Sequence, residues 1–109
     1  MSTESVIKHH IQALAEGDLD EIMADYSENS VFLTNDNVIE GLDGIRAVFA
    51  GAIANGGFVV NMQHELYHND AAYITWNVPG VIALGTDTFI VKDGSIVLQT
   101  NALMMAPKP

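Results

Sequence analysis

VIALGTDTFIV at 81–91 and IVLQTNALM at 96–104 are two runs of β-forming residues, and the turn dipeptide Asp93-Gly94 lies between them. This segment is the clearest indication of the fold. β-Branched and aromatic residues favour strands, and Asp-Gly between two such runs is a strong hairpin signal. Two similar runs precede them, at 58–67 and 73–78. The second half of the chain is therefore predicted to form four consecutive antiparallel strands.

The first half of the chain shows helical spacing instead. Apolar side chains recur at this spacing in three stripes: Ile7-His10-Ile11-Leu14, Leu19-Ile22-Met23-Tyr26 and Ile45-Val48-Phe49-Ala52-Ile53. We expect the first helix to end at Gly17, and the third to run from near Asp43 to Gly56-Gly57. A short hairpin at 31–34 and 38–39 precedes the third helix, so the predicted order is ααββαββββ.

Length and composition indicate one globular domain, 1–109, with a short tail at 105–109. Fourteen acidic residues against four Lys and Arg give a formal net charge of −10, which repels nucleic-acid phosphates and anionic membranes. The absence of Cys excludes disulfides and thiolate metal sites. The first residues lack signal-peptide features, and no apolar run approaches the roughly 20 residues of a membrane span, so we expect a cytoplasmic protein.

One short motif resembles a metal site. His64-Glu65-Leu66-Tyr67-His68 matches H-E-x-x-H, which binds zinc in metalloproteases when it lies on a helix. Here the motif follows a β-branched run, and on a strand its two His would stand roughly 13 Å apart. We therefore expect no metal.

Two ionisable residues lie on predicted apolar faces. His10 belongs to the stripe of the first helix, either as a core histidine satisfied by a hydrogen bond or as an acid, base or donor in a pocket. Asp87 alternates with Phe89 and Val91 on one face of its strand, where burial would raise its pKa. If Gly85 interrupts the alternation, Asp87 is instead a solvated turn residue.

Polar side chains also alternate with apolar ones on two other strands. One strand has Thr75 and Asn77 between Ile74, Trp76 and Val78, and the last strand has Gln99 and Asn101 between Leu98, Thr100 and Ala102. Taken alone, this alternation is typical of a sheet with its apolar face on the core and its polar face in water.

The element order resembles that of the nuclear transport factor 2-like superfamily, as do three segments: Ala15-Glu16-Gly17-Asp18-Leu19-Asp20, Glu40-Gly41-Leu42-Asp43-Gly44-Ile45-Arg46, and Asp87-Thr88-Phe89 with Asp93-Gly94-Ser95-Ile96. The likeness is greatest to ketosteroid isomerase and SnoaL-like polyketide cyclases. It implies an α+β fold, with about six strands in a cone-shaped, curved, mostly antiparallel sheet and three helices on its concave face. A small-molecule pocket is expected between the two layers.

The resemblance also implies the site residues. It places Asp87 at the oxyanion-hole Asp of ketosteroid isomerase, His10 at its Tyr and Thr34 at its general base. Asp87 and His10 are then the catalytic candidates, and the expected ligand-binding residues are Phe32, Thr34, Phe49, Thr75, Asn77, Gln99 and Asn101. The opposite, convex face would form a homodimer through Trp76, Val78, Leu98 and Ala102.

Two functions follow from this resemblance. One is an isomerase, cyclase or lyase that acts on a carbonyl compound by acid-base chemistry without a cofactor. The other is a non-catalytic, dimeric ligand-binding or interaction module. The second is favoured by Thr34, because threonine cannot take a substrate proton at neutral pH.

Overall fold

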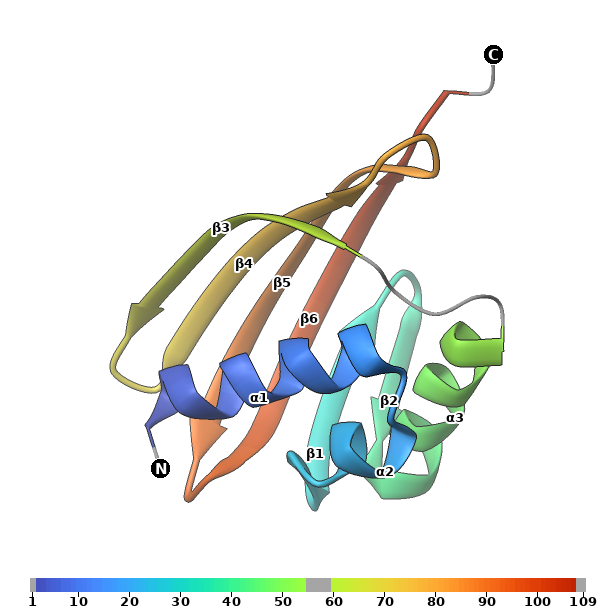
Figure 1. Cartoon of the computed structure of the whole chain (residues 1–109). Helices are drawn as coiled ribbons and strands as arrows, with labels where there is room; N and C mark the ends of the chain where they lie inside the picture. The colour runs from blue at the N-terminus through green and yellow to red at the C-terminus, as the bar shows by residue number, and fades with distance from the viewer. Residues whose placement is uncertain (1, 55–59, 108–109) are drawn as a thin grey trace.

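The computed structural model describes residues 2–54 and 60–107, where three helices lie on one face of a curved, six-stranded sheet (Figure 1). The elements are α1 (Thr3–Glu16), α2 (Leu19–Met23), β1 (Tyr26–Thr34), β2 (Asn37–Glu40), α3 (Gly41–Ala54), β3 (Asn61–His68), β4 (Ala71–Val78), β5 (Ile82–Lys92) and β6 (Ser95–Met105). The predicted fold class and element order are confirmed.

Several ends shift along the same element, as where the strand predicted at 73–78 begins at Ala71, and at two ends a residue belongs to another element than predicted. Tyr26 was expected on the second helix but begins β1, because the backbone N–H of Ile96 donates to the carbonyl of Asp25 (2.7 Å) and Tyr26 pairs with Ile96 on β6. Met105 was placed in the tail but belongs to β6. The predicted helix end at Gly56-Gly57, and the start of the strand predicted at 58–67, lie outside the described residues.

The sheet has the strand order β2-β1-β6-β5-β4-β3. Neighbouring strands are antiparallel except β1 and β6, which are parallel. The register aligns Thr34, Asn101, Asp87 and Ile74 in one row across β1, β6, β5 and β4. Residues directly opposite one another in such a row share a face of the sheet, so this register brings polar groups from distant parts of the sequence together.

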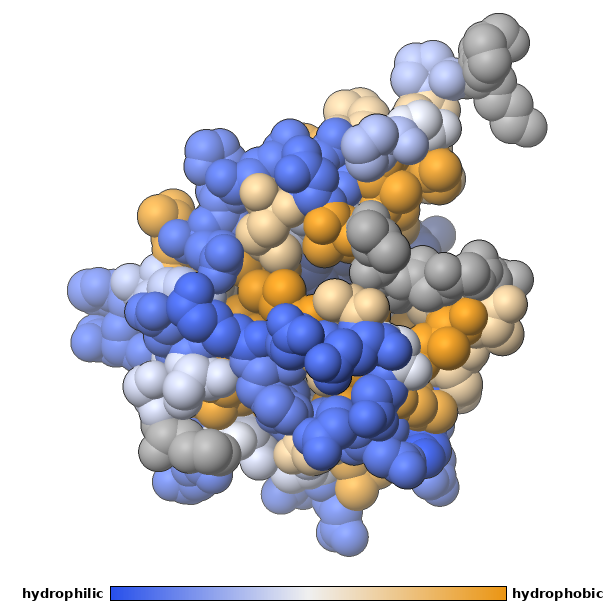
Figure 2. Space-filling model, in the orientation of Figure 1, coloured by the Kyte–Doolittle hydropathy of each residue, from blue (hydrophilic) through white to orange (hydrophobic). Residues whose placement is uncertain are grey.

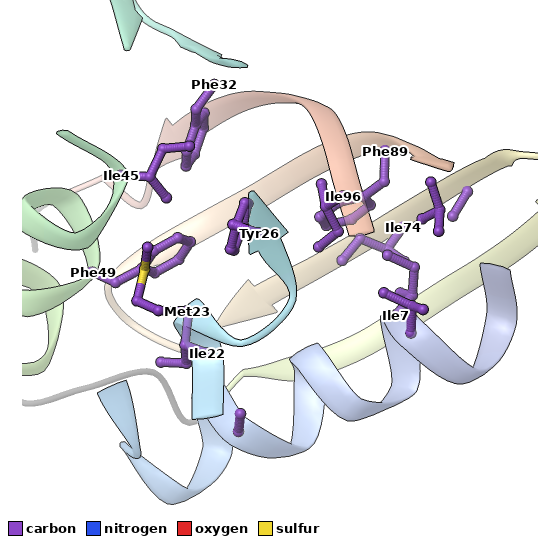
Figure 3. Close-up of a cluster of buried hydrophobic side chains, with 14 of the residues drawn as sticks. Ile7, Ile22, Met23, Tyr26, Phe32, Ile45, Phe49, Ile74, Phe89 and Ile96 are labelled. Atoms are coloured by element: carbon purple, nitrogen blue, oxygen red, sulfur yellow. The ribbon is translucent and has the colours of Figure 1, made fainter. Parts of the chain in front are cut away.

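The hydrophobic core lies between the helices and the sheet (Figure 3). Ile7 of α1, Ile22 of α2, Phe49 of α3 and Phe89 of β5 are all at most 5% exposed. Local sequence defines α1, since Ser2 accepts a hydrogen bond from the Ser5 backbone N–H at its start. Gly17 ends the helix in the left-handed conformation that glycine adopts without strain.

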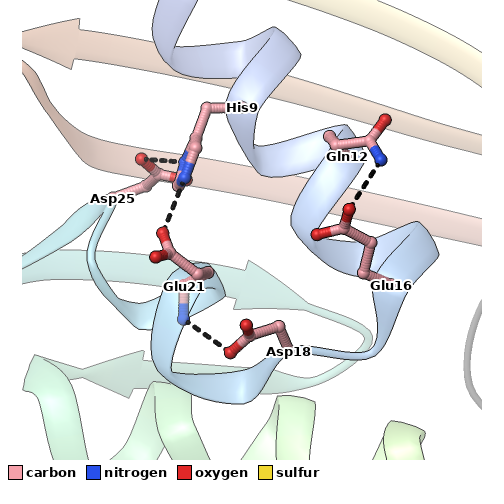
Figure 4. A network of polar contacts seen from close by, with 6 residues as sticks. All are labelled: His9, Gln12, Glu16, Asp18, Glu21 and Asp25. Atoms are coloured by element: carbon pink, nitrogen blue, oxygen red, sulfur yellow. Dashed lines mark hydrogen bonds and ion pairs between the residues drawn. The ribbon is translucent and has the colours of Figure 1, made fainter.

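His9 ties α1 to the segment that follows it (Figure 4). Its Nδ1 lies 2.7 Å from Oδ2 of the buried Asp25, and its Nε2 lies 2.9 Å from Oε2 of Glu21. The hydrogen bonds to Asp25 and Glu21, in that order, raise the pKa of His9 above its ordinary 6.5. These two hydrogen bonds of His9 help to fix the position of α1 over the sheet, and with it the position of His10.

Candidate functional site

A cavity of about 240 Å³ lies between the sheet and helices α1 and α3. In the space-filling view, apolar side chains gather in the hollow between the hydrophilic surface of α1 and the strands above it (Figure 2). The lining includes most of the predicted site residues, namely His10, Phe32, Thr34, Phe49, Asp87, Gln99 and Asn101. Side chains from helices α1 and α3 and from strands β1, β3, β4, β5 and β6 thus meet in one largely apolar pocket.

Strand β4 is turned opposite to the prediction. Trp76 was expected on the convex face, yet it lines the cavity with Ile74, while Thr75 and Asn77 do not line it. Since successive side chains of a strand point to opposite faces, Thr75 and Asn77 lie on the other side of the sheet. The physical reason is that the Trp76 ring supplies both apolar surface and an N–H donor to the cavity, so no polar side chain of β4 is needed there.

The predicted convex interface changes accordingly. Trp76 is 6% exposed inside the fold, and Val78 packs against the hydrophobic core, so neither belongs to an outward apolar face. Leu98 and Ala102 alternate with the cavity residues of β6 and therefore do face away from the cavity.

Asp87 is the hydrogen-bonding centre of the cavity. Its Oδ1 accepts from Nε1 of Trp76 (2.8 Å) and from Nδ2 of Asn101 (3.1 Å), and its Oδ2 accepts from Nε2 of Gln99 (2.8 Å). The side chain is buried, so the alternative of a solvated turn residue is wrong. Three neutral N–H donors hold this carboxylate in one orientation at the sheet surface.

A second layer of polar groups orients two of these donors. The hydroxyl of the buried Tyr26 donates to Oε1 of Gln99, which leaves the Gln99 amide nitrogen to face Asp87. The hydroxyl of Thr34 donates to Oδ1 of Asn101 (3.2 Å), which turns the Asn101 amide nitrogen the same way. Thr34 therefore acts on Asp87 through Asn101.

Gly85 makes room for the Trp76 indole. The two residues are paired across β5 and β4, and a Cβ added to Gly85 would lie 2.4 Å from Cε2 and Cζ2 of the ring. Any larger residue would displace the indole from this position. The isolated glycine therefore marks a close approach of a side chain and not a break in the strand.

The environment of Asp87 acts on its acidity in two directions. Burial raises its pKa above the ordinary 3.8, while the hydrogen bonds from Trp76, Gln99 and Asn101 lower it, and burial has the larger effect. Asp87 is consequently a stronger base than an exposed aspartate, and its orientation is fixed.

His10 lies in an aromatic cage at the α1 side of the cavity. Its ring makes edge-on contacts with Tyr26, Phe49 and Phe89, with centroids 5.6–5.7 Å apart. Burial lowers its pKa to about 3, so the imidazole is neutral at physiological pH. Within the described part of the chain its Nδ1 has no hydrogen-bond partner and no hydrogen bond joins it to Asp87. The two catalytic candidates line the same cavity without a hydrogen bond between them.

The H-E-x-x-H segment lies on β3, with His64 and His68 both exposed. Its strand conformation agrees with the prediction. Across residues 2–54 and 60–107, no cluster of three or more His, Asp or Glu side chains is arranged to hold a metal ion. No helix in the same ranges is long and apolar enough to cross a membrane.

Sequence reasoning missed two residues of the hydrogen-bond network around Asp87, Trp76 and Tyr26. Trp76 was assigned to the wrong face, and Tyr26 was assigned to a helix. The single signal available was Gly85, since a lone glycine inside a strand often marks a bulge or the close approach of another group. Pairing it with Trp76 requires the register of β4 and β5, which the sequence does not state.

The fold is shared with several solved structures of low sequence identity. A candidate polyketide cyclase from Sinorhizobium meliloti, protein SMa1630, matches with a TM-score of 0.80 and 18% identity over 90% of this chain and 94% of that one. AclR, a candidate hydroxylase from Streptomyces galilaeus, matches with a TM-score of 0.77 and 14% identity over 96% and 80% of the two chains. An LEH-like epoxide hydrolase from M. tuberculosis matches with a TM-score of 0.74 and 17% identity, over 94% of this chain and 82% of that one.

At these identities the structural matches establish the fold alone. No curated protein matches the sequence. A family model described as the SnoaL-like domain matches residues 7–99, from within α1 to Gln99 of β6, one of the donors to Asp87. The chain therefore belongs to the SnoaL-like domain family.

Proposed function

We propose that this SnoaL-like domain binds a small carbonyl compound in the cavity and uses Asp87 as a general base in an isomerase, cyclase or lyase reaction. The observation that carries the proposal is a buried carboxylate held by three N–H donors in the wall of an apolar cavity. Perturbed ionisable groups in such cavities are typical of catalytic sites. Structural neighbours that include a candidate cyclase and an epoxide hydrolase also support an enzyme.

The proposed step is removal of a proton from the carbon next to the carbonyl group. The C–H bond breaks, its electron pair moves toward the carbonyl oxygen to form an enolate, and the proton goes to Asp87. Oδ2 is the oxygen suited to receive it, because Oδ2 accepts one hydrogen bond while Oδ1 accepts two. Return of the proton to another carbon completes an isomerisation.

His10 takes part in this proposal only as a neutral group. With a pKa of about 3 it is not an imidazolium near pH 7, so it does not act as a general acid toward Asp87. An N–H of the neutral ring is suited to stabilise the enolate oxygen as a hydrogen-bond donor. Its position in the cavity lining supports this role.

The test uses 2-tetralone, a bicyclic ketone. NMR measures the rate at which its α-protons exchange for deuterium in D₂O. We expect the protein to accelerate exchange above the buffer rate, and Asp87→Asn to lower the protein-dependent rate by about a hundredfold or more. Asp93→Asn is the matched control, since Asp93 is exposed in the β5–β6 turn and its left-handed backbone suits Asn. An Asp87→Asn variant that is folded and as fast as the wild type would remove Asp87 from the reaction.

A non-catalytic binding module is the second candidate. It is favoured by the lining, in which the described residues include no ionisable group other than Asp87 and the neutral His10. Binding of 2-tetralone without any acceleration of exchange, in wild type and variant alike, would select this alternative.

The homodimer is retained as a proposal with a smaller interface. Leu98 and Ala102 are the predicted interface residues that still face away from the cavity. Sedimentation of the wild type at micromolar concentration tests it, and a pure monomer would refute it.

A further inference from the structure

The cavity carries negative charge and no described positive charge. Its lining includes Asp87 but no Lys or Arg. The cationic side chains in residues 2–54 and 60–107 instead pair with carboxylates elsewhere: Lys8 with Glu65, Arg46 with Asp20, and Lys92 with Asp70. A ligand with a carboxylate or phosphate group would therefore meet a like charge in the cavity and no partner for its own.

The carboxylate of Asp87 can accept one more hydrogen bond. A carboxylate accepts about four hydrogen bonds, two at each oxygen. Trp76 and Asn101 fill Oδ1, and Gln99 takes one position at Oδ2. A ligand that meets the remaining position at Oδ2 must bring a donor or an acidic proton, such as the hydroxyl of an alcohol or the C–H next to the carbonyl group of a ketone.

The dimensions of the cavity limit the ligand to one or two rings. Its volume of about 240 Å³ exceeds the roughly 150 Å³ of an apolar cavity that holds benzene. It is smaller than the roughly 300 Å³ at which pockets for drug-sized molecules begin. The walls include the rings of Phe32, Phe49, Trp76 and Phe89, which favour a flat apolar skeleton.

We propose that the cavity selects molecules of one or two rings without an anionic group, whose proton-donating group faces Oδ2 of Asp87, and that it excludes carboxylates and phosphates. The inference rests on the proposed function in using the same cavity and the same oxygen. It adds the charge class and the size of the substrate.

The experiment compares three probes that share one ring system and differ in charge: naphthalene-2-methanol, naphthalene-2-carboxylate and 2-naphthylmethylammonium. Affinities are measured by calorimetry at pH 7 with the 109-residue chain. We expect the alcohol to bind, and the carboxylate to bind at least about a hundredfold more weakly, because a like charge in a buried site is strongly unfavourable. Carboxylate binding as tight as that of the alcohol or of the ammonium probe would overturn the proposal.

Two variants locate the effect. In Asp87→Asn the preference for the alcohol over the carboxylate should fall below about tenfold, because the repelling charge is gone. Ala52→Phe fills the cavity from α3 and should abolish binding of the alcohol, whereas Ala47→Phe, on the exposed face of α3, should leave it unchanged. Full discrimination in a folded Asp87→Asn, or alcohol binding in Ala52→Phe, would each contradict the proposal.

The binding data and the exchange data separate the two proposals. Binding that discriminates by charge without exchange of α-protons leaves the ligand class standing and removes the proposed reaction. Exchange that depends on Asp87 without charge discrimination does the reverse.

Discussion

Strands β4 and β6 carry the same alternation of polar and apolar residues, yet they turn opposite sets toward the cavity. On β4 the apolar residues Ile74 and Trp76 line it, and on β6 the polar residues Gln99 and Asn101 do. Both strands nevertheless donate hydrogen bonds to Asp87, which lies on the strand between them. Alternation defines the two faces of a strand, whereas the partners available on the neighbouring strand decide which face points inward.

The largest effect expected from this comparison is that of Trp76→Ala. Removal of a buried indole should lower the free energy of unfolding by about 3–5 kcal/mol. Tyr73→Ala is the matched control, because Tyr73 is an aromatic residue on the other face of β4 and is 40% exposed. It should cost less than about 1 kcal/mol. Urea unfolding measures both, and equal losses would mean that Trp76 is not the inward residue.

Gly85→Ala tests the close contact between the backbone of Gly85 and the Trp76 indole. The added Cβ should displace the ring and lower the free energy of unfolding by up to about 3 kcal/mol, with a change in tryptophan fluorescence. Gly51→Ala, on the exposed side of α3 with no atom near its Cβ position, should raise it by up to about 1 kcal/mol. A neutral Gly85→Ala with native fluorescence would contradict the close packing of β4 on β5.

Gln99→Leu tests the polar face of β6. It removes the partner of the Tyr26 hydroxyl and one donor to Asp87, so we expect a loss of about 2 kcal/mol in urea unfolding. Thr75→Val should leave stability unchanged or raise it, because it replaces a buried hydroxyl that has no hydrogen-bond partner among the described residues by a methyl group of similar size. Should Thr75→Val prove the more costly of the two, the assignment of faces would be reversed.

The smallest expected effect is that of Trp76→Phe on the pKa of Asp87. This pKa is measured by carbon NMR of the Asp87 carboxyl group as the pH is varied. Trp76→Phe removes a hydrogen bond that lowers this pKa, so the pKa should rise further above 3.8. Asn77→Leu, on the outer face of β4, should leave it unchanged.

The same titration has a consequence for stability. Because the pKa of folded Asp87 lies above 3.8, the folded state binds a proton more tightly than the unfolded chain. The free energy of unfolding should therefore fall as pH rises from 3.8 to the folded pKa, and this interval should widen in Trp76→Phe. Stability that rises across the interval would show that hydrogen bonding outweighs burial at Asp87.

Much of the site was predictable where one element contained the signal. His10 in its helical stripe and Asp87 beside Phe89 were assigned to inward faces from local spacing, and both line the cavity. Gln99 and Asn101 required the family resemblance, since their alternation alone favours a solvent-exposed polar face. The same resemblance misplaced Thr75 and Asn77, because a polar residue at a matching position does not show which way its strand is turned.

The number, type and order of the elements could be predicted from the amino-acid sequence alone, because helical and strand periodicity are local properties of neighbouring residues. The sequence also determined that the charge is strongly negative and that Cys chemistry is absent. Three features are visible only in the folded chain: Trp76 lies over Gly85, Tyr26 orients Gln99, and the carboxylate of Asp87 has three donors. These contacts depend on the registers of β4, β5 and β6, and a register is a relation between distant segments that no local pattern contains.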